Sequence, residues 1–300
     1  HNGAVEDIIA VDDGRSIVSA GGGDNRLRLW SVPPLLGVAL HLPAGHDDSV
    51  TSLLELAPSR LVRAVFGEAM VASLVLSAAR DHTVRLWAAS AGGSRELAMA
   101  RFPAPVSALH LAPSGTVIAM LASNICFLGM AGPPWRLSQV GVGAAAANTA
   151  STIINCCLPD VGDATLLCTT TRLSLGGAKT VRLWRVVAGP ALVEMDGFDL
   201  RAALGTKAPV LSMAPLPAAQ LAVATSNAIV IVAVPSGVIL VRIAMPFGSG
   251  KLARNPGGTS AGRLIAFCDG HGAMAWPVSW VRRRAAVVCW DVAAYPSEYA

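Results

Sequence analysis

A histidine, a serine, an aspartate and a tryptophan recur together in this chain, and such side chains can pass hydrogen bonds from one to the next. Over residues 44–101 they are His46, Ser77, Asp81 and Trp87. Three of these types also serve nucleophilic catalysis, which needs an exposed hydroxyl, an oxyanion hole and a cleft. Ser77 instead lies within a predicted strand, without the G-x-S-x-G turn of a nucleophile elbow. We therefore interpret the set as a buried network that holds a sheet together.

Other groups that could do chemistry also favour structural roles. Gly21-Gly22-Gly23 leads into a strand and lacks the Lys-Ser/Thr of a phosphate-binding loop, so we expect a hairpin turn. Asp12-Asp13 and Asp47-Asp48 lie at turns. Cys156-Cys157 has no basic residue nearby to activate a thiol. The six cysteines form no CxxC pair and no zinc spacing, so we expect neither a metal nor a cofactor.

Arg282-Arg283-Arg284 is the dense basic run of the sequence, and two interpretations of it stay open. It is either a solvated connection between strands or a surface for phosphate or an acidic partner. A net charge of +4 does not make nucleic-acid binding the default function. With no interleaved aromatic residue beyond Trp280, we expect at most indirect or weak contact with RNA.

Repeated hairpins must position these residues. Leu76 to Trp87 has the pattern of a strand, a polar turn and a second strand that alternates polar and apolar residues. A hairpin that recurs in this way cannot bury its own face, so the copies must pack on each other. The anchors recur at intervals of 41 to 58 residues, close to the period of about 40 to 45 of a four-stranded unit with insertions. They are Trp30, Trp87, Leu128, Trp184, Val232 and either Trp276 or Trp290.

Composition excludes two classes of protein. The chain is 53% hydrophobic and 14% charged, which excludes disorder and requires a large buried interior. Residues 220–245 are apolar, but polar residues and turns divide them into strand-length pieces, whereas a membrane helix needs about 20 uninterrupted residues. We therefore expect an intracellular protein with reduced core cysteines and no membrane segment.

This repeated pattern resembles the WD-repeat β-propellers over nearly the whole chain. In that family a histidine before the first strand, a hydroxyl on the second, an aspartate in the turn and a tryptophan on the third bond to one another. The second unit matches this set fully. The first unit keeps His1, Asp24 and Trp30 but has Ala20 at the hydroxyl position, and the fourth keeps Ser174 and Trp184 but has Ala178 for the aspartate.

The resemblance implies an all-β fold, a single β-propeller domain over residues 1–300 with six visible four-stranded blades, and six or seven in the intact protein. No spare strand precedes His1, so we expect a ring that is incompletely closed. Because the second unit alone has the complete set, we predict the second blade to be the most rigid and the third the least. The blades are expected at 1–43, 44–101, 102–145, 146–200, 201–247 and 248–300.

A narrower likeness lies in the first two-fifths of the chain. Leu29-Trp30-Ser31-Val32, Val50-Thr51-Ser52-Leu53 and Arg101-Phe102-Pro103, which leads into a hairpin without tryptophan, are similar to the WD-repeat subunit of a nuclear large-ribosomal-subunit assembly complex. In that family the complex supports removal of a transcribed spacer in rRNA processing and recruits the ATPase Midasin. The likeness implies a non-catalytic, nuclear or nucleolar scaffold for several proteins, with no small-molecule substrate; without this narrower likeness the expected location is cytoplasmic.

Three other functions are open, two of them from other classes. Substrate receptors of cullin-type ubiquitin ligases often carry an arginine two residues after a Trp-Asp pair, but Val292-Ala293 follows Trp290-Asp291 here. Another generic WD-repeat adaptor also fits the repeats. Catalysis by the propeller would need acids, bases or metal ligands around its channel, where the predicted inner strands offer mainly aliphatic residues. We therefore predict that the protein is not an enzyme.

Overall fold

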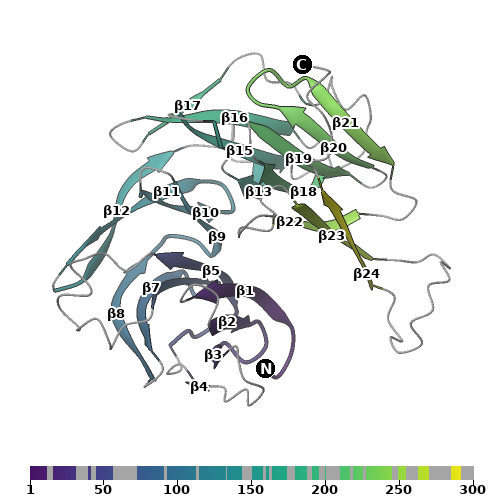
Figure 1. Cartoon of the computed structure of the whole chain (residues 1–300). Helices are drawn as coiled ribbons and strands as arrows, with labels where there is room; N and C mark the ends of the chain where they lie inside the picture. Colours follow the sequence, from purple (N-terminus) through teal and green to yellow (C-terminus); the bar gives the residue numbers. More distant parts are fainter. Residues whose placement is uncertain are drawn as a thin grey trace, which may run out of the picture. The chain divides into compact units, whose positions relative to one another are not determined.

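The computed structural model of the chain consists of antiparallel β-sheets (Figure 1). Every element with described bounds is a strand, from β1 to β24. The chain forms two compact units, His1–Ala144 and Ala145–Ala300, which are described separately below. The structure describes residues 1–11, 16–31, 40–41, 45–56, 73–90, 93–112, 115–132, 134–143, 151–157, 160–161, 164–173, 180–187, 191–195, 200, 210–216, 219–225, 228–244, 249–254, 263–269 and 285–291.

The first unit holds three four-stranded sheets, and in each of them every strand pairs antiparallel with the strand before it along the chain. Each sheet falls within one of the residue ranges expected for a blade. The strands of the first sheet are β1 (Val5–Val11), β2 (Ser16–Gly21), β3 (Leu27–Ser31) and β4 (Leu40–His41); those of the second are β5 (Val50–Leu56), β6 (Ser73–Ala79), β7 (Thr83–Ser90) and β8 (Gly93–Arg101); those of the third are β9 (Val106–Leu111), β10 (Val117–Leu121), β11 (Ile125–Ala131) and β12 (Arg136–Gly143).

The second unit also holds three sheets, which depart from a uniform four strands. The fourth sheet has five strands because the two-residue β14 pairs with β15, and the sixth sheet shows three strands within the described residues. The strands are β13 (Ser151–Cys157), β14 (Asp160–Val161), β15 (Ala164–Leu173), β16 (Thr180–Val187) and β17 (Ala191–Glu194); then β18 (Val210–Leu216), β19 (Gln220–Thr225), β20 (Ala228–Ala233) and β21 (Ile239–Ala244); then β22 (Ser249–Arg254), β23 (Arg263–Asp269) and β24 (Ala285–Asp291).

One register is repeated in all six sheets, and it confirms the alignment of the anchors. The anchor always lies on the third strand, opposite an aliphatic residue of the second. In the sixth sheet Leu264 pairs with Trp290, so Trp290 is the anchor of that sheet, whereas Trp276 lies outside the described residues. The other pairs are Ile17 with Trp30, Val75 with Trp87, Val117 with Leu128, Leu167 with Trp184 and Leu221 with Val232.

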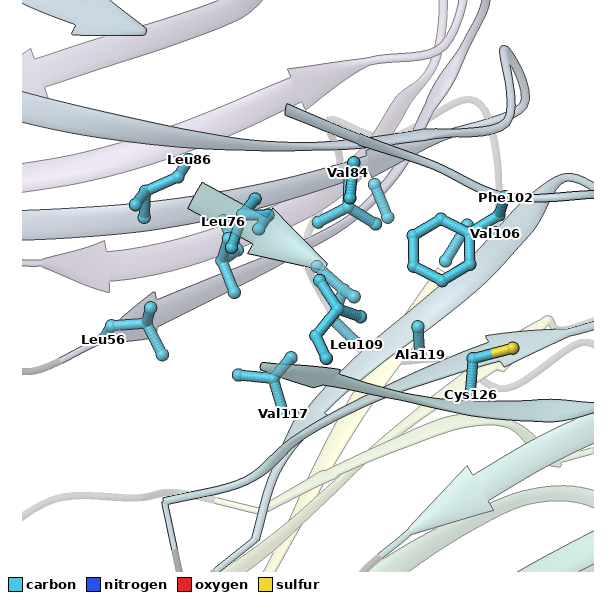
Figure 2. Packing of buried hydrophobic residues seen from close by; sticks show 14 of the residues in the cluster. Leu56, Leu76, Val84, Leu86, Phe102, Val106, Leu109, Val117, Ala119 and Cys126 are labelled. Carbon is cyan, nitrogen blue, oxygen red and sulfur yellow. The ribbon is translucent and has the colours of Figure 1, made fainter. Parts of the chain in front are cut away.

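The cores of the first unit lie between neighbouring sheets. β6 is buried along its full length because it is the second strand of its sheet, paired on both edges, with an apolar sheet on either face. On one side, Leu76 and Leu86 of the second sheet pack against Leu109 and Val117 of the third (Figure 2). On the other side, Trp87 joins the core that the first and second sheets share. Each sheet is too thin to bury a core alone and is stabilised by its neighbours, as in other repeat architectures.

Hydrogen bonds between inner strands join the sheets of this unit, although the sheets share no ladder. β1, β5 and β9 each carry a bulge after their first residue. The residue after the bulge then accepts a backbone N–H from the next inner strand. Leu53 N–H donates to Asp7 Oδ2 at 2.7 Å, and Leu109 N–H donates to Ser52 Oγ at 3.1 Å. These two bonds satisfy backbone donors that would otherwise be left at sheet edges.

Candidate functional site

The second sheet contains a directional chain of hydrogen bonds. Trp87 Nε1–H donates to Ser77 Oγ at 2.8 Å, and Ser77 Oγ lies 2.7 Å from His46 Nε2. At the other side of the ring, His46 Nδ1 lies 2.9 Å from Asp81 Oδ2. We assign the imidazole proton to Nδ1, because a neutral ring then donates to the carboxylate and accepts from the serine hydroxyl. Within this network of four residues, every polar side-chain atom has a hydrogen-bond partner.

The turn between β6 and β7 holds Asp81 in place. Its carboxylate accepts the Thr83 N–H at 2.9 Å, the Thr83 hydroxyl at 2.7 Å and the Asp47 N–H at 3.1 Å. His82 lies between these residues with a φ of 68°, in the left-handed region that closes the turn. The carboxylate therefore ties the segment that enters the sheet, which carries His46 and Asp47, to the hairpin beneath it.

Burial and hydrogen bonding together set the charges of His46 and Asp81. Burial lowers the pKa of His46, and the hydrogen bond and charge of Asp81 oppose this only in part. For Asp81, burial alone would raise the pKa, but hydrogen bonds from Thr83, His46 and the Asp47 N–H outweigh it and lower the pKa. At neutral pH the imidazole is therefore uncharged and the carboxylate is ionised.

This arrangement of serine, histidine and aspartate is closed to substrates. The side chains of His46 and Asp81 are 1% and 5% exposed, and Ser77 is fully buried. The serine hydroxyl is also occupied, since it accepts from Trp87 and lies against His46. A nucleophile needs access and a free approach to its oxygen. The geometry accordingly fits structural stabilisation and not acyl transfer.

The first sheet has the same network, and one expectation about it is wrong. His1 Nδ1 lies 2.8 Å from Asp24 Oδ1, and Trp30 Nε1–H donates to Ser19 Oγ at 2.8 Å. Ser19 Oγ also lies 2.8 Å from His1 Nε2. The expectation was that Ala20 occupies the hydroxyl position and that the hydroxyl is missing. The hydroxyl is instead present one residue earlier, on Ser19. Its separation from the tryptophan is 11 residues against 10 in the second sheet, because the turn is one residue longer.

Gly21 makes room for this first network. A Cβ atom at this position would overlap Asp24 Oδ1 and His1 Nδ1. Arg28 completes the surroundings of the carboxylate, with a guanidinium nitrogen 3.0 Å from Asp24 Oδ2. No side chain other than hydrogen fits at residue 21 without displacing the histidine–aspartate pair.

The fourth sheet corrects a second expectation. Trp184 Nε1–H donates to Thr169 Oγ1 at 2.8 Å, so the hydroxyl comes from a buried threonine of β15. The expected partner, Ser174, lies outside the described residues, as does Ala178. The two bonded residues are 15 apart because the β15–β16 connection is longer than the turn of the second sheet.

The third and fifth sheets have aliphatic residues at the same register. Ala119 and Val223 occupy the hydroxyl positions, and both are fully buried. Leu128 and Val232 occupy the tryptophan positions. These two sheets rely on packing at the positions where the first, second and fourth sheets have a hydrogen bond from tryptophan to a hydroxyl. The predicted basic patch, Arg282, Arg283 and Arg284, lies outside the described residues.

Comparison with known proteins shows the fold. No family model matches the chain, and no curated protein matches it. Among solved structures, the β-propeller domain of Cps50 (Swd1) from Myceliophteria thermophila aligns with 97% of this chain and 98% of that one, with a TM-score of 0.51 and 16% sequence identity. At this identity the likeness establishes fold alone: the chain has the all-β fold of a β-propeller. Within the described residues, no helix has the length and apolar character of a membrane span.

Proposed function

We propose that this protein is a non-catalytic scaffold that binds several proteins at once. The observation that carries the proposal is the sealed network of the second sheet. The side chains best able to do chemistry are buried and bonded to each other, so they stabilise the sheet and leave recognition to the loops and edges. Loops on a rigid support commonly provide binding surfaces, and the β-propeller fold is compatible with this role.

The finer proposal is a WD-repeat ring of six blades, one for each sheet, in a nuclear or nucleolar complex that assembles the large ribosomal subunit and supports rRNA processing. Its support is the sequence likeness of Leu29–Val32 and Val50–Leu53, and of the Phe102-Pro103 lead into the third sheet. The proposed partners are protein subunits of that complex, and contact with rRNA is indirect or weak.

Affinity purification of the tagged full-length protein, followed by mass spectrometry, tests both levels. We expect large-subunit assembly factors to copurify and to remain after ribonuclease treatment, because protein contacts hold the complex. Recovery of a cullin adaptor in their place would identify a ubiquitin-ligase receptor. Recovery of no protein above an untagged control would contradict the scaffold itself.

A further inference from the structure

We draw no further inference here: the strongest candidate, the apolar patch of Val5 and Ile8 on β1 of the first sheet, which are 47% and 59% exposed, carries no proposal because nothing in the part of the chain that the structure describes shows what covers it.

Discussion

The second and third sheets of the first unit each bury a histidine nitrogen, in opposite circumstances. His46, in the second sheet, has a partner at both ring nitrogens. His110, on β9 of the third sheet, has a buried Nε2 atom with no hydrogen-bond partner among the residues that the structure describes. Burial lowers the pKa of His110 to about 4. The same residue type thus stabilises the second sheet and is a liability in the third, because only the second of these two sheets supplies a serine and an aspartate around it.

The second and third sheets share one strand register but differ in the side chains that stabilise them. Val117 pairs with Leu128 in the third sheet as Val75 pairs with Trp87 in the second. The hydroxyl position is Ser77 in one and Ala119 in the other, and both residues are fully buried. The strand pairing of a blade therefore does not depend on the polar network. We expect the network to add resistance to opening.

The largest expected effect is the loss of Asp81. Asp81→Ala removes the acceptor of four donors and should lower the free energy of unfolding by about 3–5 kcal/mol. In the corresponding turn of the third sheet, the Asn124 carbonyl accepts the Leu121 N–H. Asn124→Ala keeps this backbone bond and should cost about 1 kcal/mol or less. Chemical denaturation of both variants measures the difference, and equal losses would contradict a special role for the carboxylate.

The next largest expected effect is a loss of folding stability in acid, which should arise mainly from His110. A folded-state pKa near 4 lies below the ordinary value of 6.5, so between these values the unfolded chain binds a proton that the folded chain does not. Stability should therefore fall by about 3 kcal/mol as the pH falls from about 6.5 to 4. His46 acts in the same direction, because its pKa is also lowered. Asp81 adds a loss below its ordinary value of 3.8, since its pKa is lowered as well.

His110→Leu isolates the histidine of the third sheet. The variant should reduce the pH dependence of unfolding between pH 6.5 and 4 to the part that His46 contributes, and it should leave the loss at lower pH, which belongs to carboxylates. Denaturation midpoints across this range measure both parts. A slope as steep as that of the unaltered chain would show that His110 is not the titrating group.

Exchanging the residues at the two hydroxyl positions, Ser77 in the second sheet and Ala119 in the third, should lower stability by a smaller amount in each case. Ser77→Ala leaves the Trp87 N–H and His46 Nε2 buried without partners, which should cost about 1–3 kcal/mol. Ala119→Ser places a hydroxyl among aliphatic side chains of the third sheet and should cost a similar amount, about 1–3 kcal/mol. If the serine stabilised the third sheet, a hidden polar partner would have to be present there.

The smallest expected effect concerns the turn of the second sheet. His82 adopts a φ of 68°, which glycine adopts without steric cost. His82→Gly should therefore raise the free energy of unfolding by up to about 1 kcal/mol, less the added entropy of the unfolded chain. Thermal unfolding measures this change. A clear loss of stability would show that the His82 side chain contributes contacts of its own.

Much of the fold could be predicted from the sequence because its signals are local. Alternation marks each third strand, a tryptophan adds to it in the first, second, fourth and sixth sheets, and a separation of 10 residues between Ser77 and Trp87 marks a short turn. Ser19 and Thr169 were missed because longer turns shift the hydroxyl relative to the tryptophan, and only strand pairing reveals the correspondence. The register that makes Trp290 an anchor likewise depends on pairing with β23.

Other features have no local signal. The bonds from Leu53 to Asp7 and from Leu109 to Ser52 join strands about 50 residues apart, and depend on how the sheets pack. The unpartnered nitrogen of His110 is equally a product of packing, because β9 has the same apolar pattern as the other inner strands. A sequence pattern shows which face is buried, but not which polar atoms will meet there.

Native-state hydrogen exchange of the full chain tests most directly whether the network makes the second sheet harder to open than the third. Amides of β6 and β10 occupy equivalent second strands and are buried by neighbouring sheets. We predict that the opening free energy in β6 exceeds that in β10 by about 1–2 kcal/mol, and that Ser77→Ala removes this excess. Equal protection of the two strands, or stronger protection of β10, would contradict the account.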